Sequence, residues 1–438
     1  MKMKKFFSMV IVFCFGILLL AACGDKEKTS DLEQKVGQLT AENSQLKETL
    51  QKVAPEGGRT FKLGCSLAIT GPTSDVGAPY SKGVEDYINY VNDTKMLGTD
   101  KVECFIRDDG YQNEVTKRNF EDFLNEGIVL YLNYSTGSTL ALKKDFEEVK
   151  IPVIPASFHA GNLTDSNYIF LPIVSYSSQA IALLEYIVAN HKGDTPKIAM
   201  FIHPSAFGRA PVEDVQKAVA AGLKVDIVEV DEHGQDLDYT AMLKRWTNKK
   251  VQYVICHTVQ PPVATLLKSA QGLGIAAKTY GEPGKLTFMG LHYAGGPDLI
   301  ALAGSAAENY YWTTSYKLTS EKGEGTTAQL ALAQEYGRDE QTANSQNYTN
   351  GIQVAQIAVE AILRAKAKGK EITRQSLYEE LLAMHGYDAY YPLTTVGPVT
   401  YSETDRQGVD SLQLYKVKDG VFIAVGSPFR SELVTAMQ

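Results

Sequence analysis

The amino-acid sequence predicts an α/β protein of two lobes, each with a parallel sheet covered by helices on both faces. Three observations support this fold class. The chain has 438 residues, which is too long for one compact core and suits two lobes. From residue 60 onward, continuous apolar runs alternate with segments of helical periodicity, as in parallel sheets. The alternation starts again at about residue 175, so two sheets fit better than one very large sheet.

The first series of elements begins with an expected strand at 60–69, TFKLGCSLAI. A helix follows this strand, because Val84, Tyr87, Ile88 and Val91 recur on one face at helical spacing. The other elements expected in this series are strands at 101–109, 128–134 and 151–157, and helices at about 115–126 and 138–149.

The second series shows the same alternation. Its helix VEDVQKAVAA, residues 212–221, is followed by Gly222 in the usual position after a helix. The other elements expected in this series are strands at 196–203, 223–230, 251–257 and 286–291, and helices at 181–191, at about 239–248 and from about 263.

The first 22 residues have the features of a secretory signal. Lys2, Lys4 and Lys5 precede an apolar run that ends in small residues before Cys23. The sequence LLAAC, residues 19–23, resembles a lipobox, in which the cysteine is lipidated and becomes the mature N-terminus. We therefore expect a lipoprotein that is anchored through Cys23 to the extracytoplasmic face of a bacterial membrane.

A polar tether, residues 23–31, leads to a helical or coiled-coil stalk at 32–54. Apolar residues recur in heptads along the stalk, and Asn43 occupies an a position, which favours a parallel dimer in register. Two interpretations stay open. The stalk is either a parallel homodimer through residues 32–53 or a single amphipathic spacer helix.

Net charge and cysteine content restrict the class of protein. Removing the signal, with its three lysines, changes the formal charge from −8 to −11, and an acidic chain without a basic stripe is a poor nucleic-acid binder. Beyond the N-terminal region, Cys65, Cys104 and Cys256 all lie in apolar runs, an odd and sparse set that predicts no disulfide framework. Cys65 and Cys104 could pair if their strands are neighbours, but the sequence favours buried free thiols.

The sequence lacks the motifs of common enzymes and metal sites. It contains no GxSxG, phosphate-loop, HExxH or CxxC motif, and its seven histidines are scattered singly. The segment GLGIAA, residues 272–277, has the glycine spacing of a dinucleotide-binding turn but follows a helical segment, so we expect a helix end there. Asp108 and Asp109 end a strand, where a turn or helix cap is a commoner role than a metal or acid pair. We expect no catalysis, no metal and no cofactor.

Two polar loops follow expected strands, NYSTGST at 133–139 and PASFHAG at 155–161. Open α/β sheets bind ligands at the carboxyl ends of their strands, where helix N-termini present free N–H groups. The hydroxyls of Ser135, Thr136 and Ser157, with backbone amides, could hold a carboxylate without a basic side chain. The same residues could cap helices, and the two roles are compatible.

Four segments, in this order, resemble the branched-chain amino-acid-binding protein family, the type I periplasmic solute-binding proteins of ABC transporters. They are LAITGPTSDVGAPYSKGVEDYINYVN at 67–92, RDDGYQNEV at 107–115, STGST at 135–139 and IPVIPAS at 151–157. The similarity covers essentially residues 60–438. It implies two Rossmann-like lobes with parallel sheets, joined by three crossovers, that close on a ligand in the cleft between them. The implied boundaries are 60–174 plus 313–408 for lobe one and 175–312 plus 409–438 for lobe two.

The resemblance also implies ligand-binding residues. Ser135 and Thr136 would supply hydroxyls to a ligand carboxylate, and Ala156 and Ser157 would add backbone groups and a further hydroxyl. Phe207 stands where the amino-acid binders usually have a tyrosine. A second tyrosine of lobe two is replaced by Val259 or Gln260, depending on the gap.

One departure from the family pattern changes the expected solute. The acid that pairs with the ligand ammonium is replaced by His292, and a buried ammonium without a compensating charge is costly. We therefore favour a solute with a carboxylate or another polar oxygen and an apolar or aromatic body. The residues expected to form the wall for that body are Tyr134, Phe158, Phe207 and Tyr293. A zwitterionic aliphatic amino acid is the second choice.

The sequence thus predicts a lipid-anchored extracytoplasmic solute-binding protein of an ABC importer, with a permease and ATPase complex as its partner. The alternative is a surface sensor or adhesion lipoprotein that is dimerised by the stalk. A hydrolase that uses Asp108 or His292 is a third possibility, and the lack of a nucleophile–base arrangement disfavours it.

Overall fold

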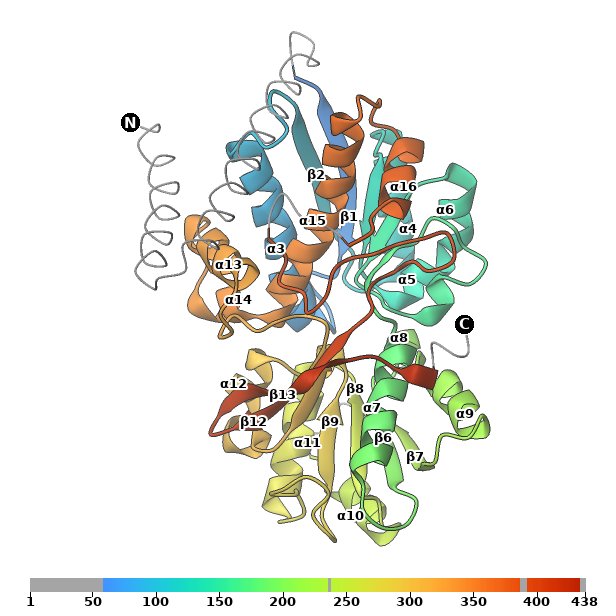
Figure 1. Cartoon of the computed structure of the whole chain (residues 1–438), viewed down its shortest axis with the longest axis vertical. Helices are drawn as coiled ribbons and strands as arrows, with labels where there is room; N and C mark the ends of the chain where they lie inside the picture. The colour runs from blue at the N-terminus through green and yellow to red at the C-terminus, as the bar shows by residue number, and fades with distance from the viewer. Residues whose placement is uncertain (1–57, 235–237, 387–391, 434–438) are drawn as a thin grey trace, which may run out of the picture. The chain divides into compact units, whose positions relative to one another are not determined.

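The computed structural model describes residues 58–234, 238–386 and 392–433 (Figure 1). The expected signal segment, Cys23, the tether and the stalk lie outside these residues. None of the helices in the described ranges combines the length and the apolar character needed to cross a membrane.

Lobe one is built on a four-stranded parallel sheet with the order β2-β1-β3-β4. Its strands are β1 Thr60–Leu67, β2 Lys101–Asp108, β3 Leu130–Asn133 and β4 Val153–Pro155. Successive side chains of β3 face opposite sides of the sheet, as the two-residue period of a strand requires. Leu130 and Leu132 enter the core under α3 (Ser74–Asp93) and α15 (Gln346–Ala367). Tyr131 packs with Phe146 of α6 on the other face.

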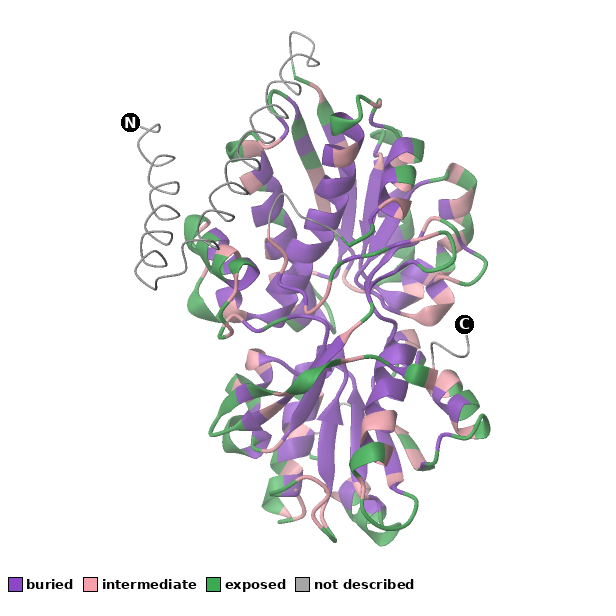
Figure 2. Cartoon of the chain, in the orientation of Figure 1, coloured by how far each residue is buried: buried purple, intermediate pink, exposed green. Residues whose placement is uncertain are grey.

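Helices cover both faces of this sheet. The helices on the face of Tyr131 are α4 Asn113–Asn125, α5 Thr136–Ala141 and α6 Lys143–Val149. The single helix expected at 138–149 is thus two shorter helices, which meet at Leu142. The central strands of both sheets are largely buried (Figure 2).

Lobe two is built on a seven-stranded sheet with the order β13-β12-β10-β9-β8-β6-β7. Its strands are β6 Lys197–Ile202, β7 Asp226–Glu232, β8 Tyr253–His257, β9 Thr287–Gly290, β10 Tyr311–Thr314, β12 Leu412–Lys418 and β13 Val421–Phe429. The strands β6 to β10 pair in parallel, whereas β12 runs antiparallel to both β10 and β13. The helices of this lobe are α7 Tyr176–Asn190, α8 Ala206–Arg209, α9 Val212–Ala220, α10 Thr240–Asn248, α11 Gln260–Gly272 and α12 Pro297–Ala303.

Three crossovers connect the lobes. The first follows β5 (Leu171–Ile173) and the third follows β11 (Gln407–Val409), and these two strands pair in parallel as a small separate sheet. The second follows β10, which belongs to the sheet of lobe two as far as Thr314. It therefore comes two residues later than the predicted boundary between 312 and 313.

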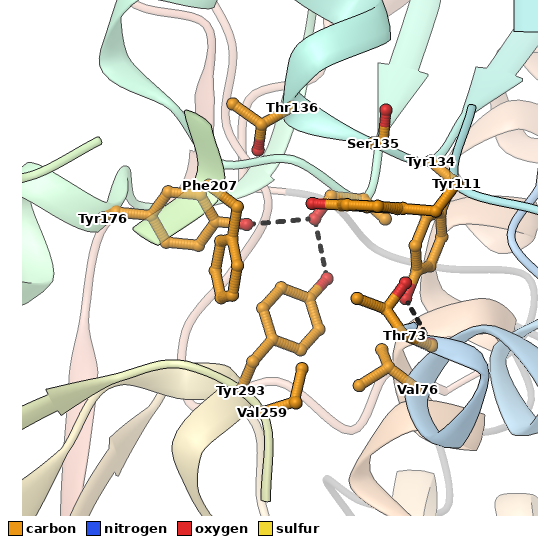
Figure 3. Close-up of a pocket in the computed structure, with 11 residues that line it drawn as sticks. Thr73, Val76, Tyr111, Tyr134, Ser135, Thr136, Tyr176, Phe207, Val259 and Tyr293 are labelled. Carbon is orange, nitrogen blue, oxygen red and sulfur yellow. Dashed lines mark hydrogen bonds between the residues drawn. The ribbon is translucent and has the colours of Figure 1, made fainter. Parts of the chain in front are cut away.

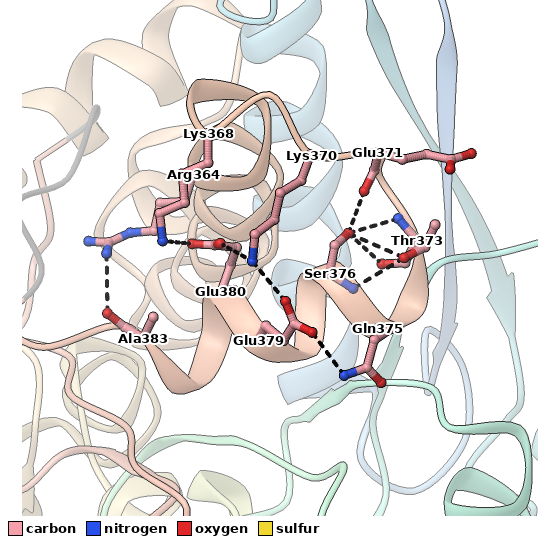
Figure 4. Close-up of polar contacts among 10 residues, drawn as sticks. All are labelled: Arg364, Lys368, Lys370, Glu371, Thr373, Gln375, Ser376, Glu379, Glu380 and Ala383. Carbon is pink, nitrogen blue, oxygen red and sulfur yellow. Dashed lines mark hydrogen bonds and ion pairs between the residues drawn. The ribbon is translucent and has the colours of Figure 1, made fainter.

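Charged contacts fix α16 (Arg374–Leu382) to α15 (Figure 4). The buried carboxylate of Glu380 lies 2.7 Å from the ammonium of Lys368 and 3.0 Å from that of Lys370. Glu360, also buried, pairs with Arg364 at 2.7 Å on the same helix.

The cysteines of lobe one correct a sequence prediction. Cys65 and Cys104 form a disulfide, so the expectation of free thiols at these positions is wrong. The physical reason is strand adjacency, since Leu63 of β1 lies beside Cys104 of β2 and the two cysteines are close neighbours across the ladder. Among the described residues, Cys256 of β8 is the free and buried cysteine.

Two sequence motifs have structural roles. The glycine-rich segment 272–277 ends α11, and Gly274 adopts a φ of +64°, which suits the end of a helix. The Asp108 carboxylate accepts hydrogen bonds from the amides of Ile69, Thr70 and Gly110. It therefore fixes the loops at the ends of β1 and β2, which is the turn role that the sequence favoured.

Candidate functional site

A pocket lies at the carboxyl ends of the strands of lobe one and is closed by residues of lobe two. Its empty space, including the open solvent at its mouth, is about 300 Å³. The lining residues, shown in Figure 3, are Thr73, Val76, Tyr111, Tyr134, Ser135, Thr136, Ala156, Tyr176, Phe207, Val259 and Tyr293. None of these described residues carries an acidic or basic side chain.

Ser135 lines the pocket from the loop after β3. It is the N-cap of α5, and its Oγ accepts a hydrogen bond from the amide of Ser138 at 3.1 Å. The Ser138 hydroxyl has its own acceptor in the Ser135 carbonyl, at 3.2 Å. The Ser135 hydroxyl therefore caps the helix as an acceptor, and it also lies 2.7 Å from the Ser138 hydroxyl, a contact in which either oxygen can donate.

Thr136 is oriented by a short chain of hydrogen bonds. Asn162 donates from Nδ2 to the Ser157 hydroxyl at 3.2 Å. The Ser157 hydroxyl lies 2.7 Å from Oγ1 of Thr136 and can donate a hydrogen bond to that oxygen. The Thr136 hydroxyl can then donate on the pocket side, where the Tyr176 hydroxyl is its neighbour. Ser157 thus acts through Thr136 and does not itself line the pocket.

The carbonyl oxygen of Ala156 is already occupied by tyrosine hydroxyls. Tyr293 of lobe two donates to it at 2.7 Å and Tyr176 approaches it at 3.4 Å (Figure 3). Nδ2 of Asn350 donates in turn to the Tyr293 hydroxyl at 2.8 Å. Because a carbonyl oxygen has two lone pairs, this acceptor has little capacity left for a ligand ammonium.

Aromatic rings form the rest of the wall. The ring of Phe207 lies edge-on to Tyr176 at 5.3 Å and to Tyr293 at 5.8 Å between centroids. Tyr111 and Tyr134 meet edge to face at 6.2 Å on the other side. Burial raises the pKa of all four tyrosine hydroxyls, so they stay protonated at neutral pH.

Two residues assigned from the sequence lie behind this wall. Phe158 stacks on Tyr293 with centroids 5.5 Å apart, and the His292 ring lies 4.6 Å from Tyr293. Nδ1 of His292 is 3.0 Å from the Thr314 hydroxyl, and burial lowers the histidine pKa to about 3. His292 is therefore neutral, and neither it nor Phe158 lines the pocket.

A second neutral histidine, His257, packs against the aromatic wall. His257 lies 4.4 Å from the ring of Phe207 and 4.6 Å from that of Tyr176, and its Nε2 donates to the Phe207 carbonyl at 2.9 Å. Burial lowers its pKa to about 3. It fixes the position of Phe207 without adding a charge to the site.

Six of the residues that were assigned to the site from the sequence line the pocket: Tyr134, Ser135, Thr136, Ala156, Phe207 and Tyr293. It did not assign Thr73, Val76, Tyr111 or Tyr176. The first three lie inside the segments at 67–92 and 107–115 that carry the family resemblance, so closer attention to those loops could have found them. Tyr176 follows the first crossover, and no local pattern marks it.

No cluster in the described ranges suits a metal, because no three His, Cys, Asp or Glu side chains come together there. The pocket can instead offer hydroxyl donors at one end and apolar or aromatic surface around the remainder. Its chemistry is that of reversible binding of a small organic molecule.

Many solved structures are similar to this chain. A branched-chain amino acid ABC transporter structure from Thermus thermophilus, with bound valine, is 42% identical in sequence. It has a TM-score of 0.82, and the alignment covers 87% of this chain and 99% of that one. A fatty acid ABC transporter substrate-binding protein from Thermomonospora curvata, 20% identical over 87% of this chain and 96% of that one with a TM-score of 0.73, shares the fold.

A curated relative is the leucine-, isoleucine-, valine-, threonine- and alanine-binding protein of Pseudomonas aeruginosa, which is 25% identical. This match spans 57% of the chain and 65% of the relative, just under two thirds of its length. The sequence pattern described as "Periplasmic binding protein" matches residues 60–421. The chain therefore belongs to the periplasmic binding protein family and has its type I fold.

Proposed function

We propose that the protein is the solute receptor of an ABC importer and binds a small carboxylate that lacks an ammonium group. One observation carries this proposal. Among the described residues, the pocket lining has no ionised side chain but has two hydroxyls, those of Ser135 and Thr136, whose protons can turn from their present neighbours toward an oxygen anion. Hydrogen bonds to a charged group are stronger than neutral ones, so two such donors can hold a carboxylate.

The remaining surface suits an apolar or aromatic body. Phe207, Val259 and Val76 present side chains without polar atoms, and the tyrosines present ring faces. A site of this kind gains affinity from burying apolar area and gains specificity from a few polar contacts. The small volume favours a compact acid, such as a substituted benzoate or a short branched fatty acid.

The second candidate is an aliphatic amino acid. Two comparisons favour it: the 42% identical structure contains valine, and the Pseudomonas relative is named as a binder of aliphatic amino acids and threonine. In this pocket the ammonium would have to displace the Tyr293 hydroxyl from the Ala156 carbonyl, and the residues that line the pocket include no acid to compensate its charge. The residues that line the pocket therefore support a carboxylate without an ammonium more strongly than they support an amino acid.

Anchoring and transport complete the proposal. The LLAAC sequence at 19–23 supports lipidation of Cys23, and the family match supports an extracytoplasmic receptor that delivers its solute to a permease. Ligand contacts from both lobes would favour the closed state that the permease recognises. Replacing Cys23 with serine should release the protein from the membrane fraction, which fractionation and immunoblotting of the cells would detect.

The test of the solute class begins with removal of any solute that co-purifies. The protein is unfolded, dialysed and refolded, and the released solute is identified by mass spectrometry. Calorimetry then compares benzoate and 3-methylbutanoate with valine and leucine. We expect micromolar or tighter binding of at least one simple carboxylate. Tight binding of valine or leucine, with no response to the simple carboxylates, would overturn the proposal.

A further inference from the structure

Thr73 is a pocket residue whose hydroxyl has no hydrogen-bond partner among the described residues. Its side chain is buried, with 3% of its surface exposed, and its Oγ1 is fully enclosed. The residue stands at the N-cap of α3, where threonine usually bonds a backbone amide of the first turn. Here it makes no such bond.

The first turn of α3 is satisfied without the Thr73 hydroxyl. The amide of Ser74 donates to the Gly71 carbonyl, and the amide of Gly77 donates to the Thr73 carbonyl. The Asp75 carboxylate interacts with the amides of Asp75 and Val76. The helix therefore gives no structural reason for a hydroxyl at position 73.

The backbone fixes where this hydroxyl lies. Gly77 lets α3 approach the end of β1 closely, because a Cβ at this position would lie 1.9 Å from the Ala68 carbonyl oxygen. Tyr134 ties the loop from the other side, since its hydroxyl donates to the Thr73 carbonyl at 3.2 Å. Thr73 is thus held against the pocket and cannot easily turn away.

Thr73 lies at one end of the pocket, and Ser135 and Thr136 lie at the other end. Figure 3 shows Thr73 beside Tyr111 and Tyr134, with Thr136 across the cavity. The Thr73 hydroxyl also lies near the Tyr134 hydroxyl, without a well-aligned hydrogen bond between them, and the Tyr134 hydroxyl has already given its proton to the Thr73 carbonyl. The two oxygens therefore offer one donor and free lone pairs to a ligand.

A buried hydroxyl without a partner is costly, and a ligand that pairs with it removes that cost. We propose that Thr73 is a second polar contact of the site and selects solutes that carry a hydroxyl or carbonyl at the end remote from the carboxylate. This inference rests on the proposed function, because the carboxylate at Ser135 and Thr136 sets the orientation of the solute. It narrows the solute class to hydroxylated or oxo-substituted carboxylates, for example a hydroxybenzoate.

The test uses matched pairs of ligands in which a hydroxyl replaces a hydrogen, as in the benzoates, or a methyl group, as in threonine and valine. Calorimetry measures benzoate against 3- and 4-hydroxybenzoate, and valine against threonine, in the full chain after removal of co-purified solute. The variants are Thr73→Val, which keeps the shape and removes the hydroxyl, and Thr73→Ser, which keeps the hydroxyl. Thr136→Val is the control at the carboxylate end.

In the wild type we expect one hydroxylated ligand to bind about tenfold more tightly than its partner, as one buried hydrogen bond allows. Thr73→Val should abolish this ratio, and Thr73→Ser should retain it. Thr136→Val should weaken both members of the pair and leave the ratio in place. The unliganded thermal midpoint of Thr73→Val should be no lower than that of the wild type, which separates a ligand contact from a structural role.

A hydroxyl preference that is absent in the wild type, or that survives in Thr73→Val, would overturn the inference. Failure of the proposed function has a different signature. If the valine–threonine pair binds and the benzoates do not, the solute class is wrong, and the threonine-to-valine ratio still decides the role of Thr73. If no carboxylate of either class binds, both proposals fall.

Discussion

The two lobes contribute different chemistry to the same pocket. Lobe one supplies the hydroxyls of Thr73, Ser135 and Thr136, which have protons or lone pairs available to a ligand. Lobe two supplies Phe207 and Val259, which have no polar side-chain atoms, together with tyrosines whose hydroxyls are already bonded to lobe one. The difference indicates that lobe one recognises the polar groups of the solute, whereas lobe two covers its body and closes the site.

Removing both carboxylate donors should have the largest effect. The double variant Ser135→Ala, Thr136→Val loses two hydrogen bonds to a charged group, each worth about 1.5–3 kcal/mol, so calorimetry should show a loss of roughly 100-fold or more in affinity. Loss of the Ser135 cap should lower the free energy of unfolding by about 1 kcal/mol, which leaves the protein folded. A loss of less than threefold would mean that lobe one does not hold the carboxylate.

The Tyr293 hydroxyl is the point where the lobes meet at the Ala156 carbonyl. Tyr293→Phe removes this donor and leaves Asn350 Nδ2 without its acceptor. We expect about tenfold weaker binding of a simple carboxylate, since an unmet buried group costs about 1–3 kcal/mol. Valine should lose less, because the freed carbonyl can accept from an ammonium. Equal losses for valine and for the carboxylate would contradict this role of the hydroxyl.

Phe207 tests the contribution of lobe two. Phe207→Leu keeps an apolar side chain but removes the edge-to-face contacts with Tyr176 and Tyr293, worth about 0.5–1.5 kcal/mol, so the affinity for an aromatic carboxylate should fall roughly fivefold. Phe158→Leu is the matched control, because Phe158 is buried behind Tyr293 and does not line the pocket. If the control weakens binding as much as Phe207→Leu, packing rather than contact explains the loss.

The part of the site that follows from local pattern was predictable from the sequence. Ser135 and Thr136 follow an apolar strand directly, so their place at its carboxyl end could be read from the order of residues. Thr73 and Tyr176 could not be found in this way, because their side chains meet the pocket only through tertiary packing. The position of His292 was correctly placed after β9, but the direction of its side chain depends on a bond to Thr314, which no sequence pattern predicts.

The disulfide was missed for a related reason. Whether Cys65 and Cys104 can meet depends on β1 and β2 being neighbours in register, and the order of strands in a sheet differs from their order along the chain. The alternation of strands and helices fixes the fold class, because each apolar run must be buried. It does not fix which strands pair.

A change of pH should have the smallest effect on binding. The lining tyrosines have raised pKa values, and burial lowers the pKa of His257 and His292 to about 3, so none of these groups titrates between pH 5.5 and 8. Burial raises the pKa of Asp75, between Thr73 and Val76, to about 6, but Asp75 does not line the pocket. We expect the affinity for a carboxylate to change less than about twofold over this range. A larger change by calorimetry would show that an ionisable group contacts the solute.

The same histidines should make the stability of the fold depend on pH. The unfolded chain binds protons on His257 and His292 below about pH 6.5, whereas the folded chain does not until about pH 3. The contribution of these residues to the free energy of unfolding is therefore fully present above pH 6.5 and is lost as the pH falls toward 3. In urea unfolding near pH 5, His257→Gln should reduce the slope of the free energy of unfolding against pH by about 1.4 kcal/mol per pH unit.

The central claim is that the site accepts a carboxylate and has no place for an ammonium. The most direct measurement compares valine with 3-methylbutanoate, which differ only by the amino group, by calorimetry on the refolded protein. The account predicts that 3-methylbutanoate binds at least about tenfold more tightly, since an unpaired buried ammonium costs more than one hydrogen bond. Tighter binding of valine would contradict it.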